Sequence, residues 1–331
     1  MMKSNDKINI VLGADDNYAM PLAVTMYSIM ENVNNDAKLQ FYILDGDISP
    51  KNRKSINRVF RINNIGEKHK ICWKDLKVNA LNKLPKSGNS QMVYLPFLIP
   101  ELLPATCKKA IFLDCDLIVK EDIATLWKQD INGWAICAAR DVFIQKLANS
   151  NGVFDYRVYG GKAESHYFNA GVMIINLKYW SKHNVLQKLV DYLGNHKDSP
   201  NLNDEVALNA VLAEQWKELN PLWNQHGSIF WPHVLPKSEF TKRILGMYNE
   251  LKNHPYVVHF ISESKPWSYK CMHPGCSEFL TCLKKCGWFN RLEWKIWWYK
   301  YYINRFRWLL QDFFETLNLV NHKSFVQNHK L

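Results

Sequence analysis

The chain alternates short apolar runs with amphipathic helical patterns as far as about residue 262. The apolar runs predict strands, because the strands of a parallel sheet are buried on both faces. Between them, apolar residues recur at the three- to four-residue spacing of a helix. This alternation predicts an α/β fold with a doubly wound, mostly parallel sheet and ligands at the carboxyl ends of its strands. The expected strands are residues 8–12, 39–44, 69–73, 110–113, 134–139, 170–177 and 256–261, and the expected helices are residues 21–32, 51–63, 181–195 and 204–216.

Two long stretches interrupt this alternation. Residues 142–166 and 222–255 contain Gly, Asn, His and Pro scattered among aromatic residues, which favours loops. Loops of this length in a compact enzyme tend to be lids or substrate-binding segments. We therefore expect both stretches to border a ligand site.

The composition of the 331 residues predicts a folded protein with a large core. Apolar residues make up 47% and charged residues 22%, which excludes a disordered or low-complexity chain. No run of about 18 apolar residues is present, and the first residues lack the apolar stretch of a signal peptide. Most of the eight cysteines lie inside apolar runs, where cysteine acts as a small hydrophobe. These features predict a cytoplasmic protein.

The net charge of +11 is concentrated near the C-terminal end. Residues 281–331 contain nine Lys or Arg and three Asp or Glu, a net charge of +6. No nucleic-acid-recognition motif accompanies this charge, so no nucleic-acid partner is expected. In residues 288–314, Trp, Tyr and Phe are interleaved with Lys and Arg, which is typical of a helix lying on an anionic membrane surface.

This C-terminal helix has two interpretations. Trp294, Trp298, Tyr301 and Trp308 fall roughly on one helical face. That face either lies at the headgroups of a membrane or packs against the preceding domain, and periodicity alone does not separate the two. We divide the chain into a globular domain, residues 1–287, and a basic aromatic tail, residues 288–331.

The sharpest chemical signal is the pair Asp114 and Asp116. They follow the strand predicted at residues 110–113 and precede another apolar run at residues 117–119. Charges between two buried segments need a cation or hydrogen bonds to compensate them. Carboxylates suit Mg²⁺ or Mn²⁺, and a cation here can bridge the phosphates of a nucleotide. A lone Asp-x-Asp is more often a solvated turn, but the strand context favours a metal site.

A second signal ends the first predicted strand, where Gly13 and Ala14 precede Asp15 and Asn17. Small residues let a planar base approach the backbone, and a carboxylate or amide there can recognise the edge of a uracil. The spacing lacks Gly-x-Gly-x-x-Gly, so a dinucleotide cofactor is disfavoured. Taken singly, the segment is more typical of a capped turn that begins a helix.

Three further segments place polar groups beside apolar runs. His259 lies near the end of the last predicted strand, where a lone histidine is more often a satisfied core residue than a ligand. Beside the two aspartates it becomes a candidate third ligand, whose nitrogen favours Mn²⁺ over Mg²⁺. Lys265 follows six residues later and could neutralise a departing diphosphate. Residues 169–171 precede a buried strand and leave room for a sugar. Asp204 and Glu205 begin a predicted helix, where the helix dipole alone also favours acids.

In this order and at these separations, the five segments resemble glycosyltransferase family 8, which includes bacterial lipopolysaccharide galactosyl- and glucosyltransferases and glycogenin. The resemblance covers about residues 8–288. It implies a GT-A fold, a UDP-sugar donor, Mn²⁺ or alternatively Mg²⁺, and transfer with retention of anomeric configuration. It also implies residue roles: Gly13, Ala14, Asp15 and Asn17 at the uridine, Asp114, Asp116 and His259 at the metal, Asn169, Ala170 and Gly171 at the donor sugar, and Asp141, Asp204, Glu205 and Lys265 as catalytic candidates.

The chain departs from the family pattern at three positions. Pro96 stands where a basic residue is common, so one donor contact is missing or supplied elsewhere. Glu205 stands where a glutamine is common, and its carboxylate could stabilise positive charge at the anomeric carbon or reflect a different acceptor. Ser262 is a mild change at a small-residue position. The cysteines at 271, 276, 282 and 286, with His273 nearby, contain no Cys-x-x-Cys, which disfavours a zinc site.

We therefore predict a metal-dependent retaining glycosyltransferase. Its donor would be UDP-glucose or UDP-galactose, and its acceptor a hydroxyl of a glycan, glycolipid, lipopolysaccharide or other molecule. Residues 288–314 would attach it peripherally to the inner face of the membrane. The competing hypothesis is a non-catalytic basic protein that keeps the fold and binds a membrane or nucleic acid.

Overall fold

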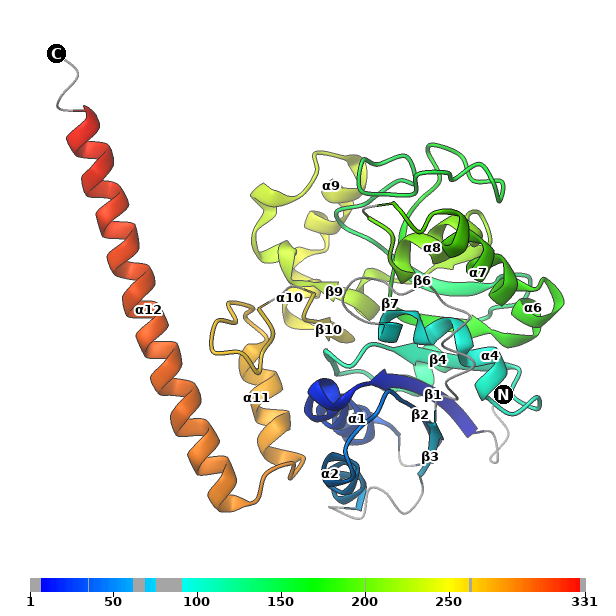
Figure 1. The fold of residues 1–331 in the computed structure, drawn as a ribbon, viewed down its shortest axis with the longest axis horizontal. Coiled ribbons are helices and arrows are strands. Elements are labelled where there is room, and N and C mark those ends of the chain that lie inside the picture. The colour runs from blue at the N-terminus through cyan, green and yellow to red at the C-terminus, as the bar shows by residue number, and fades with distance from the viewer. Residues whose placement is uncertain are drawn as a thin grey trace.

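The fold is built around a seven-stranded sheet (Figure 1). The computed structural model describes residues 7–34, 36–61, 69–75, 91–199, 201–261 and 264–327. The strand order is β3-β2-β1-β4-β7-β6-β8. The strands are β1 (Lys7–Ala14), β2 (Lys38–Asp45), β3 (Lys70–Asp75), β4 (Lys109–Leu113), β6 (Ile136–Arg140), β7 (Phe168–Asn176) and β8 (Trp216–Glu218).

The expectation of a mostly parallel α/β sheet is confirmed, with one reversal. Strands β1 to β4 run parallel, and β1 pairs with both β2 and β4. Strand β7 runs antiparallel to its two neighbours, β4 and β6. The apolar composition of β7 did not indicate this, because a strand buried on both faces has the same pattern in either direction.

Two predicted helices are shorter in the structure. The helix expected at residues 181–195 is two helices, separated at Asn184, whose φ of 51° is left-handed. Asparagine tolerates this conformation better than most residues, and it interrupts the helical path. The helix expected at residues 204–216 ends at Val211. Glu214, with a φ of 60°, then turns the chain into the edge strand β8.

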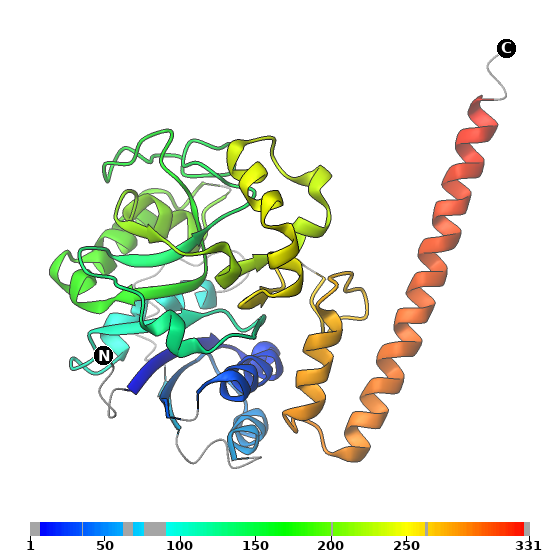
Figure 2. The same cartoon turned by 180° about the vertical axis from the view of Figure 1, so that it is seen from behind.

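Helices cover both faces of the sheet (Figures 1 and 2). In β1, Ile8, Ile10 and Leu12 pack into the core under α1 and α2, whereas Val11 packs into the core under α7 and α8. This alternation is the period-two pattern of a strand between two layers. The helices up to this point are η1 (Asp16–Tyr18), α1 (Ala19–Asn32), α2 (Pro50–Arg61), η3 (Gln91–Leu98), α4 (Ile99–Leu102), α5 (Ile123–Trp127), α6 (Leu177–Lys182), α7 (Val185–Asn195) and α8 (Asp204–Val211).

A second, three-stranded sheet lies beside the carboxyl end of β4. It has the order β5-β10-β9, from β5 (Leu117–Val119), β10 (Val257–His259) and β9 (Gln225–His226). Its pairing places His259 opposite Leu117, directly after Asp116. The stretch 222–255, expected to be loop-rich, contributes β9 and also η4 (Pro221–Asn224), η5 (Gly227–Phe230), η6 (Pro232–Val234), α9 (Glu239–Gly246) and α10 (Tyr248–Asn253).

Helices α11 (Cys276–Lys285) and α12 (Arg291–Gln327) end the described chain. Helix α12 lies beside α11 and then extends past the globular part (Figure 1). Trp294 and Trp297 pack on the core, and Tyr301 is buried with its Oη 3.4 Å from Cys276 Sγ. Arg305 donates hydrogen bonds to backbone carbonyls of the preceding loop. One face of this helix is therefore docked on the protein.

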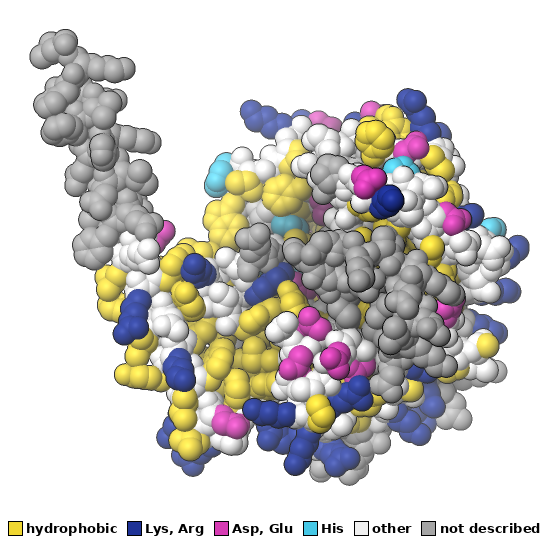
Figure 3. All heavy atoms as spheres, in the orientation of Figure 1, with side chains coloured by type: hydrophobic (Ala, Val, Ile, Leu, Met, Phe, Trp, Pro, Cys, Tyr) yellow, Lys and Arg dark blue, Asp and Glu magenta, His cyan; other side chains and the backbone are white. Residues whose placement is uncertain are grey.

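The opposite face of α12 is apolar and exposed. Its apolar side chains recur at helical intervals and are 40–68% exposed: Leu292, Ile296, Tyr299, Phe306, Leu310 and Phe313. Lys295, Lys300 and Arg307 flank this row, which we call the outer stripe. In Figure 3, hydrophobic and basic side chains alternate along the outer edge of the described part of α12. Among the described residues, no helix has the combination of length and apolarity needed to span a bilayer.

Candidate active site

The carboxyl ends of β1, β4 and β10 bring the predicted site residues together. Asp114 and Asp116 follow β4, and the Asp114 N–H donates to the carbonyl of Gly171 at 2.9 Å. The Phe260 N–H, after β10, donates to the carbonyl of Asp116 at 3.1 Å. These backbone bonds fix both aspartates against the two strands that carry Gly171 and His259.

Asp114, Asp116 and His259 form a group suited to one cation. Each offers a ligand atom, and these atoms lie within 4.8 Å of one another. His259 Nε2 is 3.6 Å from Asp114 Oδ2 and 3.4 Å from Asp116 Oδ1. Neighbouring ligands of a cation bound at 2.0–2.1 Å are separated by about 3 Å, so small adjustments would close the shell. Two carboxylates and an imidazole fit Mn²⁺ or a similar divalent ion.

Asn224 sets the orientation of His259. The imidazole Nδ1–H donates to Asn224 Oδ1 at 2.8 Å, which leaves Nε2 as the nitrogen that faces the aspartates. Such a hydrogen bond fixes the tautomer and the ring position of a metal-binding histidine. Sequence reasoning missed Asn224. It lies in the 3-10 turn η4, inside a stretch whose pattern indicated only loops.

The two aspartates have different electrostatic surroundings. Burial raises the pKa of Asp116, but His259 and Lys265 outweigh it and hold the pKa below its ordinary value. Lys265 Nζ lies 2.6 Å from Asp116 Oδ2 and also donates to the Phe260 carbonyl. The pKa of Asp114 is raised to about 6, first by burial and then by the charge of Asp116. An added cation would favour the ionised form of both groups.

A chain of hydrogen bonds runs from His259 to Glu205. Asn224 Nδ2 donates to Asn169 Oδ1 at 2.7 Å, and Asn169 Nδ2 donates to Glu205 Oε2 at 3.0 Å. The Ala170 N–H donates to the same carboxylate oxygen at 2.9 Å. The predicted metal-binding and donor-sugar residues are thus parts of one buried network, joined by Asn224.

Gly171 is required where this network meets the metal group. A Cβ added there would lie 2.7 Å from Asp114 Oδ2 and would also collide with the His259 ring. Glycine is therefore needed at position 171 because any side chain there would displace Asp114 and His259. The small residues at 169–171, which the sequence placed before a strand and the structure places inside β7, had indicated space for a sugar. The space at Gly171 is occupied by the side chains of Asp114 and His259.

The other predicted carboxylates also converge on the site. Burial and the charge of Asp141 raise the pKa of Glu205 well above its ordinary value. Burial, with Asp114, raises the pKa of Asp204 to about 7. Burial also raises the pKa of Asp141, although the Ile144 and Phe143 N–H groups donate to its Oδ1. Neighbouring buried carboxyl groups with raised pKa values repel one another when ionised. A positive charge bound nearby would stabilise their ionised forms.

The predicted uridine segment lies at the rim of this site. Cys115 Sγ donates to the Gly13 carbonyl at 3.1 Å, which joins the ends of β1 and β4. Asp15 caps η1 by accepting a hydrogen bond from the Tyr18 N–H at 3.1 Å, and Asn17 is exposed. Asp15 therefore has the helix-capping role that is typical of a turn at this position. A contact of Asp15 or Asn17 with uracil stays a prediction.

Two departures from the family pattern have different outcomes. Pro96 is buried within η3, so this position contributes apolar packing and no charged side chain. Its neighbour Leu95 contacts Gly13, where an added Cβ would come within 2.7 Å of Leu95 Cδ1. Ser262 lies outside the described residues.

The fold and site together define a class of protein, the GT-A glycosyltransferases. An active-site mutant of LgtC has a similar solved structure, with 25% identity, a TM-score of 0.70 and coverage of 84% of this chain and 96% of LgtC. The family model for glycosyl transferase family 8 matches residues 9–271. The chain belongs to glycosyltransferase family 8.

Two relatives extend this similarity over most of the chain. General stress protein A of Bacillus subtilis is 30% identical over 293 residues, covering 87% of this chain and 96% of the relative. Lipopolysaccharide 1,2-glucosyltransferase of Escherichia coli K12 is 23% identical over 289 residues, covering 87% and 80% respectively. Both matches extend well beyond the metal-binding residues.

Proposed function

We propose that this glycosyltransferase moves glucose or galactose from the UDP-sugar to a hydroxyl of a glycan, glycolipid or lipopolysaccharide, with retention of configuration and dependence on Mn²⁺. The observation that carries the proposal is the convergence of Asp114, Asp116 and His259 within 4.8 Å, at the strand ends where nucleotides bind in open α/β sheets. The name of the Escherichia coli relative, a lipopolysaccharide glucosyltransferase, supports the acceptor class.

Different residues would bind the cation, the leaving diphosphate and the donor sugar. Asp114, Asp116 and His259 would hold the cation, which supplies Lewis-acid stabilisation of the diphosphate. Lys265 would exchange its contact with Asp116 for a diphosphate oxygen and stabilise the charge of the leaving UDP. Asn169, Asp141, Asp204 and Glu205 would surround the donor sugar. The acceptor hydroxyl would then approach from the face that UDP leaves, which retains the anomeric configuration.

A donor screen tests the proposal. Purified protein should release UDP from UDP-glucose or UDP-galactose in Mn²⁺, and EDTA should abolish this release. Restoring Mn²⁺ should restore it. The competing hypothesis of a non-catalytic binding protein predicts no UDP release from any donor, together with retention of anionic vesicles or nucleic acid in EDTA. That result would overturn the proposal.

We also propose that the outer stripe of α12 attaches the protein to the inner, anionic face of the cytoplasmic membrane. Exposed apolar rows are uncommon on soluble proteins unless something covers them. Lys295, Lys300 and Arg307 flank the stripe. If two copies of α12 paired through this face, these like charges would meet across the seam, whereas an anionic lipid surface complements them.

Substitutions in the outer stripe should separate membrane binding from folding. The triple variant Ile296→Ser, Tyr299→Ser, Phe306→Ser should bind vesicles of phosphatidylglycerol and phosphatidylcholine at least about tenfold more weakly, because burial of each large side chain contributes about 1.5–3 kcal/mol. UDP release should be unchanged, since these side chains point away from the docked face. Phe154→Ser, at an 83% exposed position, is the control and should not alter binding. Equal vesicle binding by all three proteins would refute the proposal.

A further inference from the structure

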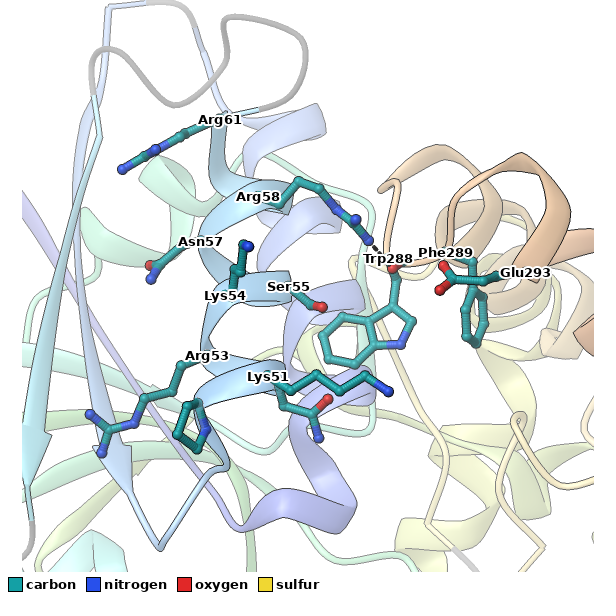
Figure 4. Close-up of a pocket in the computed structure, with 12 residues that line it drawn as sticks. Lys51, Arg53, Lys54, Ser55, Asn57, Arg58, Arg61, Trp288, Phe289 and Glu293 are labelled. Carbon is teal, nitrogen blue, oxygen red and sulfur yellow. Dashed lines mark hydrogen bonds between the residues drawn. The ribbon is translucent and has the colours of Figure 1, made fainter.

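A groove between α2 and the start of α12 has no part in the transferase site. Its volume is about 990 Å³. In Figure 4, Lys51 and Arg58 extend from α2 toward Trp288, and Phe289 and Glu293 lie on the far side. The Arg58 guanidinium donates to the Trp288 carbonyl and holds the two walls together. The groove is therefore held in place by a contact between its two walls.

The α2 wall carries a row of like charges. Lys51, Lys54, Arg58 and Arg61 all line the groove, and their spacing places them on one side of the helix. Like charges three or four residues apart on a helix repel one another and destabilise it. Helix α2 has no acidic residue to offset this repulsion.

Little within the described residues neutralises these charges. In that part of the chain, Lys51, Lys54 and Arg61 have neither an ion pair nor a side-chain hydrogen bond. The lining includes one carboxylate, that of Glu293, and its Oε2 already accepts a hydrogen bond from the Asn290 N–H at 2.9 Å. The groove thus offers several solvent-exposed cations without an ion pair among the described residues, and two of its basic side chains, Lys51 and Arg58, extend toward Trp288 (Figure 4).

We propose that this groove binds an anionic glycan chain. Residues 51 to 61 span about 15 Å at the rise of an α-helix, so the matching ligand carries several phosphate or carboxylate groups along a comparable length. A concave groove suits a chain better than a flat bilayer. The choice of a glycan rests on the proposed glycan acceptor, and the groove would anchor such an acceptor away from the reacting hydroxyl.

The groove is also linked to the donor side of the molecule. Asp16 Oδ1 accepts hydrogen bonds from Ser49 N–H and Asn52 Nδ2, both at 2.8 Å. The first turn of α2 is thereby joined to the segment after β1 that contains Asp15 and Asn17. A chain bound along α2 begins next to the predicted uridine segment, on the outside of the site.

The test is binding of fluorescent poly(glycerol phosphate) in EDTA at low salt, with uncharged dextran of equal length as the blank. The variant Lys51→Glu, Lys54→Glu should bind at least about tenfold more weakly and with a smaller salt dependence, because fewer ions are displaced. The matched control Lys178→Glu, Lys182→Glu makes the same charge change at exposed positions on α6 and should change binding less than twofold.

Each outcome decides the proposal. Equal weakening in both variants would show a general charge effect and overturn it. Tighter binding of single-stranded DNA of equal charge would assign the groove to nucleic acid instead. Full competition by anionic vesicles, measured in the outer-stripe triple variant so that the stripe itself does not hold the vesicles, would assign it to lipid. UDP release, measured in parallel with Mn²⁺, should be unchanged in both variants. If wild type releases no UDP but the groove variant alone loses glycan binding, the transferase proposal fails and the glycan site stands.

Discussion

Asp116→Asn is expected to lower the rate of sugar transfer on the order of a hundredfold or more. The substitution removes a ligand charge at the centre of the metal group and also the partner of Lys265. The asparagine has the same shape and can still accept a hydrogen bond from Lys265, so the fold should persist. Calorimetric titration with Mn²⁺ should show greatly weakened binding, and circular dichroism should show an unchanged spectrum and thermal transition.

Two comparisons make this prediction specific. Asp198→Asn removes the same charge at an exposed position and should leave both turnover and Mn²⁺ binding unchanged. His259→Ala should weaken Mn²⁺ binding less than Asp116→Asn does, because both carboxylates remain. Near-normal turnover in Asp116→Asn would show that this group is not the metal site.

Glu205→Gln is expected to reduce kcat by roughly 10- to 100-fold with little change in the affinity for the UDP-sugar. Burial raises the pKa of Glu205, and a cation bound at Asp114 and Asp116 would favour its ionised form. Near the anomeric carbon, this carboxylate would stabilise the positive charge that develops in the transition state and is absent in the ground state. The glutamine carbonyl can still accept the hydrogen bonds from Asn169 and Ala170, so only the charge is lost. Initial rates and equilibrium binding of the donor, measured on the same protein, separate the two effects.

An equal loss of donor affinity and kcat would contradict this role and make Glu205 a ground-state contact. Glu239→Gln, on the exposed start of α9, is the matched control and should behave as wild type. Retention of normal kcat in Glu205→Gln would show that the departure from the family's glutamine has no catalytic consequence and reflects the acceptor.

The sequence was informative where the chemistry lies at strand ends. Asp114 and Asp116 come directly after the apolar strand β4, and His259 ends the apolar strand β10. The pairing of β10 with β5, which follows Asp116 in the chain, brings the three side chains together. Asn224 had no such signal. Its role depends on β9 pairing with β10, and a two-residue strand within a polar stretch leaves no periodicity to detect.

The same limit applies to directions and faces. The apolar run of β7 predicts a buried strand but not its antiparallel direction, because both faces are covered either way. In α12, aromatic residues occur on all sides, so the sequence marked one aromatic face without showing that it is the docked one. Packing of Trp294 and Tyr301 on α11 and its core settles that face, and thereby defines the outer stripe opposite it.

The docking of α12 determines how the protein would be held if the outer stripe binds a membrane as proposed. Arg305 donates to the carbonyls of Tyr269 and Cys271, at 3.1 and 2.7 Å, so the helix is braced against the loop that follows Lys265. A helix fixed in this way holds the globular part rigidly, as a flexible linker would not. With the outer stripe on the bilayer, the donor site would stand at one fixed height above the headgroups. Among acceptors anchored in the same membrane, the length of the glycan stem would then select which hydroxyl is glycosylated.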